Sequence, residues 1–385
     1  MKNVYVAGVG MTNFGKSERL GRELALEAAI SAIEDAGIEP KDIDATYVSS
    51  AFGIGENQVH VGPLINSALG IPDRPSLTIE SACSGSSAAF HEAYVALSSG
   101  FYNIALVVGY EKLTMNSTPE NTRLFAMASD FWYEGLNGVT FPGLYALMAT
   151  AHMNKYGTSE EMLGSIAIKN HRNGFYNPKA HFRKIIDMDT YLKSPVVAYP
   201  LKLYDSCPFS DGAAAIILIN EDAKIKKSEL VKVLASVRSG SMAALQDRND
   251  YTGIPGAKIA SEKAYKYSKT SPEMISFAEV HDCFTIAEVM AMEDIGFFKK
   301  GDGGKASLEG ITQFDGKKPV NPSGGLKAKG HPVSATGIAQ IVEIYDQMLF
   351  RVDKNRQVSN PEIGLTHNVG ATGGSVTINI FRRLK

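Results

Sequence analysis

The 385-residue chain has little cysteine, almost no net charge and no long apolar run. Three cysteines are too few, and odd in number, for a disulfide framework or a zinc site, so we predict no metal and a reducing, cytoplasmic location. A formal charge of −2 gives no electrostatic basis for binding nucleic acid or an anionic membrane surface. Because no stretch approaches about 18 consecutive apolar residues and the N-terminus lacks a signal-peptide pattern, we predict neither a membrane span nor a secretory leader.

The composition that remains is typical of a globular enzyme, with 44% hydrophobic and 21% charged residues. Strand and helix patterns alternate along the chain, which predicts the α/β fold class. We expect an N-terminal half over residues 1–225, with an insertion at about 113–205 where the alternation is lost. A C-terminal half over residues 226–385 repeats the order of elements.

Individual elements follow from periodicity and from glycines at helix ends. The first helix is expected over 20–36, with Leu26, Ile30 and Ile33 on its apolar face. Strands are expected at 4–9, 77–79, 104–108, 213–219, 231–237, 275–280, 363–367 and 376–381. Further helices are expected at 86–99, 144–156, 160–170, from 285 to 294, and at 335–350.

Cys83 is the first candidate for chemistry, because it lies where a short strand meets a helix rich in small residues. A helix N-terminus stabilises a thiolate, lowers its pKa and offers free N–H groups to an oxyanion. His331 stands at the matching place in the second half, between Gly330 and Pro332. A rigid turn of this kind suits a general base or an oxyanion donor. The alternatives are a packed cysteine and a core or capping histidine.

His281 and Cys283 follow a predicted strand directly, and alternation would place both on one side of an extended segment. This pattern fits either a reactive thiol beside a histidine or simple packing, and it lacks the remaining ligands of a zinc site. Cys207 has no comparable surroundings and is interpreted as structural. The glycine-rich segment 367–374 is followed by no helix, which excludes a phosphate loop and leaves a substrate-facing backbone or a hairpin turn.

Taken together, these segments resemble the thiolase superfamily over nearly the whole chain. The segments that carry the resemblance are Ser81-Ala82-Cys83-Ser84-Gly85, Ser210-Asp211-Gly212, Asn321-Pro322-Ser323-Gly324-Gly325, Gly330-His331-Pro332 and residues 367–374. The resemblance implies two similar halves forming a five-layered αβαβα core. His281-Asp282-Cys283-Phe284 stands where most thiolases have Asn-Glu-x-Phe, and Asn368 stands where they carry a second catalytic cysteine. Both departures resemble sterol-carrier-protein-type thiolases and archaeal acetoacetyl-CoA thiolases.

The resemblance implies a reversible condensation of two acetyl-CoA to acetoacetyl-CoA and CoA through an acyl-enzyme on Cys83. His331 would accept the thiol proton, and Cys283 would act as acid and base at the α-carbon. His281 and His331 would donate to the enolate oxygen, and the backbone N–H groups of Cys83 and Gly370 would hold the acyl oxyanion. Cys283 is expected to titrate near a free cysteine's pKa of about 8.5.

Coenzyme A would then be substrate and product, with no permanently bound cofactor, and the insertion at 113–205 would bind it. The resemblance also implies a homodimer, a role in the mevalonate pathway and a complex with a hydroxymethylglutaryl-CoA synthase. One alternative is a ketoacyl-synthase-like condensing enzyme, which needs no base and so leaves Cys283 unexplained. The other is a non-catalytic thiolase-like subunit of a larger assembly, against which the four intact residues Cys83, His281, Cys283 and His331 argue.

Overall fold

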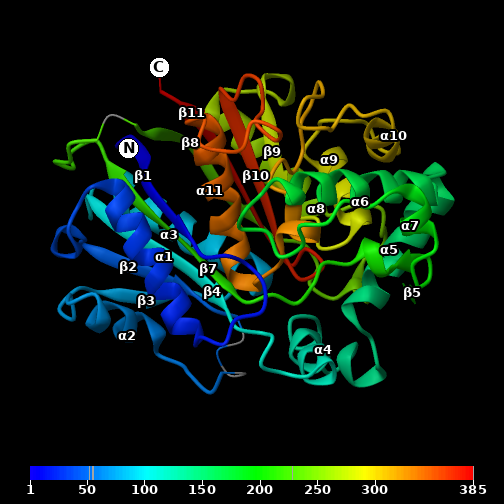
Figure 1. Cartoon of the computed structure of the whole chain (residues 1–385), viewed down its shortest axis with the longest axis horizontal. Helices are drawn as coiled ribbons and strands as arrows, with labels where there is room; N and C mark the ends of the chain where they lie inside the picture. The colour runs from blue at the N-terminus through cyan, green and yellow to red at the C-terminus, as the bar shows by residue number, and fades with distance from the viewer. Residues whose placement is uncertain (52, 54–55, 228, 385) are drawn as a thin grey trace.

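A computed structural model describes residues 1–51, 53, 56–227 and 229–384 (Figure 1). Within this part of the chain, nine strands form one hydrogen-bonded sheet in the order β3-β2-β4-β7-β1-β8-β11-β10-β9. The N-terminal half contributes β1 (Val4–Met11), β2 (Ala45–Ser49), β3 (Ser76–Thr78), β4 (Ile104–Glu111) and β7 (Gly212–Asn220). The C-terminal half contributes β8 (Val231–Ser239), β9 (Phe277–Val280), β10 (Ile363–Gly370) and β11 (Ser375–Arg383).

The strand pairing of the first half is repeated in the second. In the first half β7 lies antiparallel between β1 and β4, and β2 is parallel to β4. In the second half β11 lies antiparallel between β8 and β10, and β9 is parallel to β10. The antiparallel pair of β1 and β8 joins the two halves. The expected repetition is therefore visible as strand pairing, whereas the domain boundary at 225/226 stays a prediction.

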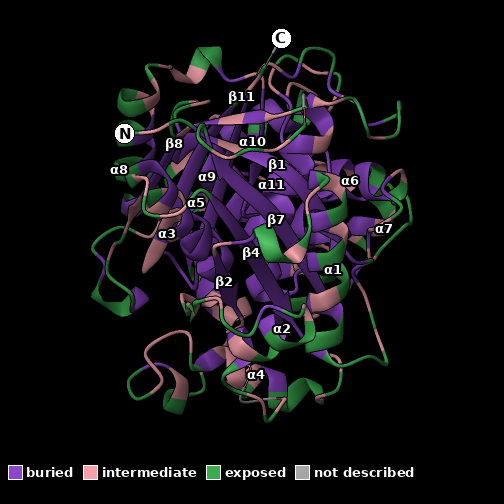
Figure 2. Ribbon diagram, turned by 90° about the vertical axis from the view of Figure 1, so that its left-hand side faces the viewer, coloured by how far each residue is buried: buried purple, intermediate pink, exposed green. Residues whose placement is uncertain are grey.

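Helices complete five layers around these strands. The first layer is α1 (Gly21–Ala36), which packs on β1, β4 and β7. The central helices α3 (Gly85–Ser99) and α11 (Thr336–Met348) contact each other and strands of both halves. The last layer is α8 (Pro255–Ser268), which packs on β8 and β11. Figures 1 and 2 show this order, with α11 and most of the strands buried in the interior, and it is the αβαβα core that the resemblance implied.

The face that α1 buries differs from the expected one. Ile33 is buried as predicted, but Leu26 is only partly buried and Ile30 is 46% exposed. The buried face consists mainly of alanines, Ala25, Ala28, Ala29, Ala32 and Ala36. The helix approaches β1 so closely that a Cβ on Gly10 would lie 2.1 Å from the carbonyl oxygen of Ala28. Close packing therefore selects small residues on this face and leaves larger side chains toward its edge.

The insertion folds into four helices and a small hairpin, none of whose strands joins the main sheet within the described residues. These elements are α4 (Thr118–Ala126), α5 (Phe141–Tyr156), α6 (Glu160–Phe175), α7 (Met188–Leu192), β5 (Val196–Ala198) and β6 (Leu201–Lys202). The helix expected from residue 144 begins at Phe141, because the Thr140 hydroxyl caps it by accepting from the Gly143 N–H at 3.3 Å.

The remaining helices are α2 (Val61–Ala68), α9 (Thr285–Asp294) and α10 (Gly303–Leu308). Among the described helices, none has the length and apolar content that crossing a bilayer requires.

A buried carboxylate anchors the beginning of the insertion to the segment that precedes β7. Asp211 accepts hydrogen bonds from the Lys112 ammonium at 2.6 Å, from the N–H groups of Leu113 and Thr114 at 2.7 and 2.8 Å, and from the Ser17 N–H at 3.0 Å. Burial alone raises the pKa of Asp211, but the hydrogen bonds from Lys112 and Thr114 outweigh it and lower the pKa below its ordinary value.

Asp211→Ala is expected to lower the free energy of unfolding by about 3–5 kcal/mol, because Lys112 is left buried without its partner. The folded pKa lies below the unfolded value of about 3.9, so this contribution is complete above that pH and is lost as pH falls through the folded pKa. Urea unfolding at pH 7 measures the loss. The control is Asp189→Ala, which breaks an exposed helix pair with Lys193 and should cost under about 0.5 kcal/mol. Equal effects of the two substitutions would contradict the assignment.

Candidate active site

The nucleophile candidate lies on a tight turn that leads into α3. Cys83 is buried, with 6% of its surface exposed, and the preceding Ala82 has φ of 47°, in the left-handed region where a side chain is strained. The Ser84 hydroxyl holds the turn by donating to the Ser81 carbonyl at 2.8 Å. A Cβ on Gly370 would lie 2.6 Å from that same carbonyl oxygen, so the last loop needs glycine to reach the nucleophile turn.

Burial raises the pKa of the Cys83 thiol to about 12, although the backbone N–H groups of Ala371 and of Cys83 itself lower it. The expectation of a lowered pKa is therefore wrong, because desolvation outweighs the dipole of the helix N-terminus. The thiol is neutral at neutral pH and needs a base. Of the two predicted oxyanion donors, the Cys83 backbone N–H faces the sulfur, and the role of Gly370 stays a prediction. The backbone N–H of Ala371, next to Gly370, also faces the thiol.

His331 has the tautomer that a base for Cys83 requires. The Thr336 hydroxyl donates to the Pro332 carbonyl at 3.1 Å, so its oxygen accepts from His331 Nδ1 at 2.6 Å. The proton therefore resides on Nδ1, and Nε2 carries the free lone pair with no partner among the described residues. Burial lowers the pKa of His331 to about 3, which keeps the ring neutral.

His281 has the opposite tautomer. The Asn368 amide nitrogen lies 3.0 Å from His281 Nδ1 and donates to it, so the proton of the neutral ring is on Nε2. Burial lowers the pKa of His281 well below its ordinary value, and His331 and His367 lower it further. The His281 Nε2–H has no partner among the described residues and is a ready hydrogen-bond donor. Asn368, to which the sequence assigned no role, fixes this tautomer.

These three side chains converge from distant parts of the chain. The Cys83 sulfur and one ring nitrogen each of His281 and His331 all lie within 4.8 Å of one another. The two imidazoles meet edge to face, with ring centroids 5.2 Å apart. A thiol, a basic nitrogen and an N–H donor thus face one small volume. Donors at this spacing can also hold a soft metal cation; the prediction that no metal binds stays a prediction.

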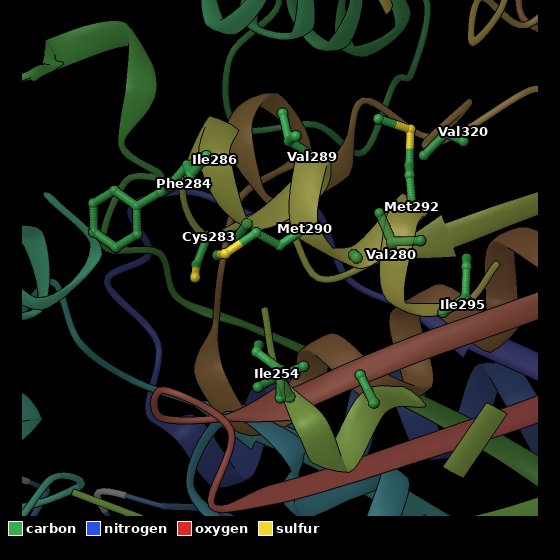
Figure 3. Packing of buried hydrophobic residues seen from close by; sticks show 14 of the residues in the cluster. Ile254, Val280, Cys283, Phe284, Ile286, Val289, Met290, Met292, Ile295 and Val320 are labelled. Atoms are coloured by element: carbon green, nitrogen blue, oxygen red, sulfur yellow. The ribbon is translucent and has the colours of Figure 1, made fainter. Parts of the chain in front are cut away.

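Cys283 joins the same site from the turn between β9 and α9, and Figure 3 shows it beside Phe284 at one end of a buried apolar cluster. Burial raises the pKa of Cys283 well above its ordinary value, and the neighbouring Cys207 raises it further, while a hydrogen bond with Tyr145 lowers it. The expectation of a free-cysteine pKa is therefore wrong, because this thiol is removed from water. Cys283 is a neutral proton donor at neutral pH.

Cys207 was interpreted as structural, yet it lines the same cavity as Cys83 and Cys283. Its backbone N–H donates to the Cys283 carbonyl at 3.0 Å, and the adjacent residues Ser206 and Phe284 form an isolated antiparallel bridge. The sequence held no signal for this position, because the pairing partner lies far away along the chain.

Asp282 turns away from the site and positions the segment that carries His331. Its carboxylate accepts from the Leu326 N–H at 2.7 Å and from the Asn170 amide at 2.7 Å. A Cβ on Gly325 would lie 2.2 Å from a carboxylate oxygen of Asp282, which explains the glycine in that motif. Burial raises the pKa of Asp282 to about 7, and Glu288 raises it further.

A cavity of about 460 Å³ opens over the four predicted side chains. Its walls are mainly apolar, and the insertion supplies part of them through Thr118, Phe125, Phe141, Val197 and Leu203. Phe125 packs against Phe209 with ring centroids 5.2 Å apart, beside the Cys83 turn. The structure thus brings Cys83, His281, Cys283 and His331 together beneath the insertion.

Comparison with known proteins identifies the class to which this site belongs. Residues 4–222 match the family model described as the thiolase N-terminal domain, and residues 238–383 match the thiolase C-terminal domain-like model. The chain belongs to the thiolase family, and its resemblance to that family is confirmed.

Among its relatives is a protein named acetyl-CoA acetyltransferase from Methanothermobacter thermautotrophicus, 43% identical over 100% of both chains. Sterol carrier protein 2 of Bos taurus is 32% identical over 98% of this chain and 72% of its own length. The solved Ltp2-ChsH2(DUF35) aldolase superimposes with a TM-score of 0.84 at 21% identity, over 98% of this chain and 97% of the other, which supports the fold.

Proposed function

We propose that the protein is an acyltransferase of the thiolase type that interconverts two acetyl-CoA with acetoacetyl-CoA and CoA. The observation that carries the proposal is the convergence of the Cys83 thiol with one ring nitrogen each of His331 and His281 within 4.8 Å, with a second thiol in the same cavity. The name of the Methanothermobacter thermautotrophicus relative supports acetyl-CoA as the substrate. Coenzyme A enters as substrate and leaves as product, and the chemistry needs no permanently bound cofactor.

In the first half-reaction His331 Nε2 accepts the Cys83 proton as the sulfur attacks the thioester carbon of acetyl-CoA. The oxyanion that forms is held by backbone N–H groups, for which we propose Cys83 and Gly370. When the tetrahedral intermediate collapses, the C–S bond to CoA breaks and the His331 imidazolium returns the proton to the CoA sulfur. The acetyl group remains on Cys83.

In the second half-reaction His331 Nε2 accepts the thiol proton of Cys283. The resulting thiolate removes an α-proton from a second acetyl-CoA, and the enolate oxygen accepts from the His281 Nε2–H. The carbanion attacks the acetyl group on Cys83, the C–S bond breaks, the Cys83 sulfur takes the proton from the His331 imidazolium, and acetoacetyl-CoA leaves. In the thiolytic direction the neutral Cys283 thiol protonates the departing enolate. A ketoacyl-synthase-like enzyme would obtain its carbanion by decarboxylation, and that reaction would need no proton transfer by Cys283.

The experiment that tests this function is the CoA-dependent loss of acetoacetyl-CoA by the purified chain. We expect two acetyl-CoA to appear for each acetoacetyl-CoA consumed. When CoA is omitted, the amount of acetoacetyl-CoA lost should not exceed the amount of enzyme present. A folded protein that leaves acetoacetyl-CoA intact but condenses a malonyl thioester would support the synthase alternative instead.

We propose a homodimer that forms along the outer edge of β3. Supporting this, β3 ends the sheet, Leu77 on it is 52% exposed, and Val95 on α3 is 45% exposed. Leu77→Lys should convert the dimer to a monomer in light-scattering measurements. Leu308→Lys, which changes a similarly exposed leucine on α10, should leave the dimer intact. A wild-type monomer, or dimers in both variants, would contradict this interface.

A complex with a hydroxymethylglutaryl-CoA synthase and a role in the mevalonate pathway are finer proposals. The complex is supported by exposed aromatic and apolar side chains on the insertion, where Trp132, Tyr133 and Leu136 are 74%, 69% and 60% exposed. We also propose a cytoplasmic location, which the three free cysteines support.

A further inference from the structure

A buried tyrosine of the insertion connects Cys283 with the loop that faces Cys83. Tyr145, on α5, is fully buried, and its ring stacks on Phe284 with centroids 4.7 Å apart and planes 28° apart. Its hydroxyl lies 3.0 Å from the carbonyl oxygen of Ala371 and donates to it. The same hydroxyl makes a side-chain hydrogen bond with Cys283.

The hydroxyl has a single proton for these two neighbours. While Cys283 is a thiol, its S–H donates to the tyrosine oxygen, and the tyrosine O–H donates to Ala371. Once Cys283 is a thiolate, it has no proton to give and becomes the stronger acceptor, so the tyrosine O–H turns from Ala371 to the sulfur. The protonation state of Cys283 therefore decides whether the Tyr145 hydroxyl donates its hydrogen bond to the Ala371 carbonyl or to the Cys283 sulfur.

We propose that Tyr145 is a positioning residue that stabilises the Cys283 thiolate and couples each proton transfer at Cys283 to the Ala371 loop beside the nucleophile. The proposal rests on the acid and base role proposed for Cys283. In thiolysis the S–H bond breaks, its proton goes to the α-carbon of the departing enolate, and the Tyr145 O–H rotates onto the sulfur. No proton leaves Tyr145, so the step balances without another reactant.

Besides Tyr145, the Lys327 ammonium favours the Cys283 thiolate, because the negative charge of Cys283 raises the pKa of Lys327. Cys207, Cys83 and Asp282 each raise the pKa of Cys283. Lys327 is the nearby cation, and its ammonium donates to the Ser206 carbonyl at 2.7 Å.

Burial and the adjoining Cys283 raise the pKa of Tyr145 well above its ordinary value, and Arg248 offsets this only in part. The Tyr145 hydroxyl therefore keeps its proton and acts as a donor, not as a base.

The test measures the thiolate directly, so it does not depend on which reaction the enzyme catalyses. In a Cys83→Ala background, the rate of iodoacetamide alkylation of Cys283 is followed against pH by peptide mass mapping, which separates it from Cys207. Tyr145→Phe keeps the ring stack and removes the hydroxyl. It should shift the pH midpoint of alkylation upward by about one to two units, the typical effect of losing a hydrogen bond to a charged group.

Tyr345→Phe is the matched control, because it also removes a buried hydroxyl that donates to backbone carbonyls, those of Ala7 and Glu229. It should leave the alkylation midpoint unchanged. With Cys83 restored, Tyr145→Phe should lower kcat for thiolysis about tenfold or more and move its pH profile in the same direction, while KM changes little. Equal midpoints in the two phenylalanine variants would overturn the proposal.

A second measurement decides the matter if Tyr145→Phe does not fold. Replacing all tyrosines biosynthetically with 3-fluorotyrosine makes each phenol more acidic and a stronger donor, with almost no change in shape. The alkylation midpoint of Cys283 should then fall, and an unchanged midpoint would contradict the role of Tyr145. If the enzyme does not process acetoacetyl-CoA but the alkylation midpoint of Cys283 still shifts as expected, only the proposed function would be overturned.

Discussion

Cys83→Ala is expected to abolish acyl transfer in both directions, with a loss in kcat/KM of at least on the order of 10⁴-fold. The thiol is the group that forms the acyl-enzyme. Among the described residues, Cys83 is the cysteine that clusters with the imidazoles of His281 and His331 within 4.8 Å. The measurement is the CoA-dependent thiolysis of acetoacetyl-CoA by the variant and by the wild type at saturating CoA.

Cys207→Ala is the matched control, because it removes a second free thiol from the wall of the same cavity. It should retain most of the activity, since Cys207 takes no part in the proposed steps. A Cys83→Ala variant that still transfers acetyl groups, or a Cys207→Ala variant that does not, would contradict the assignment of the nucleophile.

Cys283→Ala is expected to separate the two half-reactions. Exchange of labelled CoA into acetyl-CoA needs only acetylation of Cys83 and its reversal, so it should continue. Condensation and thiolysis need a proton transfer at the α-carbon, so they should fall by about 10²–10⁴-fold. Both rates can be measured on one preparation, and their ratio is independent of the fraction of folded protein.

Loss of exchange together with thiolysis would mean that Cys283 supports the acylation step or the fold instead of the proton transfer. Thiolysis at the wild-type rate would show that another group protonates the enolate. Cys283→Ser should lie between wild type and alanine, because a serine hydroxyl can occupy the position but is a far weaker acid than a thiol.

The fold was largely predictable because its main features are local or repeated. Alternating patterns located the strands, and glycines such as Gly37 and Gly100 marked the ends of α1 and α3. The apolar face of α1 was not predictable in the same way. Ile30 continues the apolar periodicity, yet the close approach of β1 at Gly10 decides which residues can be buried.

The four site residues were found because the local sequence reveals their positions. Cys83, His281 and Cys283 stand on turns between a strand and a helix, and His331 lies in a glycine- and proline-flanked turn just before α11. The raised pKa values of the two thiols, Cys83 and Cys283, were not predicted from the sequence. A pKa depends on how much water the fold removes, and the layers that bury Cys83 and Cys283 come from distant segments. Asn368 and Tyr145 were missed for the same reason, because their partners His281 and Cys283 become neighbours only in the folded chain.

The most direct test of the account is to find which cysteine carries the acetyl group. Wild-type enzyme is mixed with acetoacetyl-CoA without free CoA, quenched in acid and digested, and the three cysteine peptides are analysed by mass spectrometry. The account predicts one acetyl group, on the peptide containing Cys83, and none on those containing Cys207 or Cys283. An acetyl group on either of the other two cysteines, or a protein that consumes acetoacetyl-CoA with Cys83 unmodified, would contradict it.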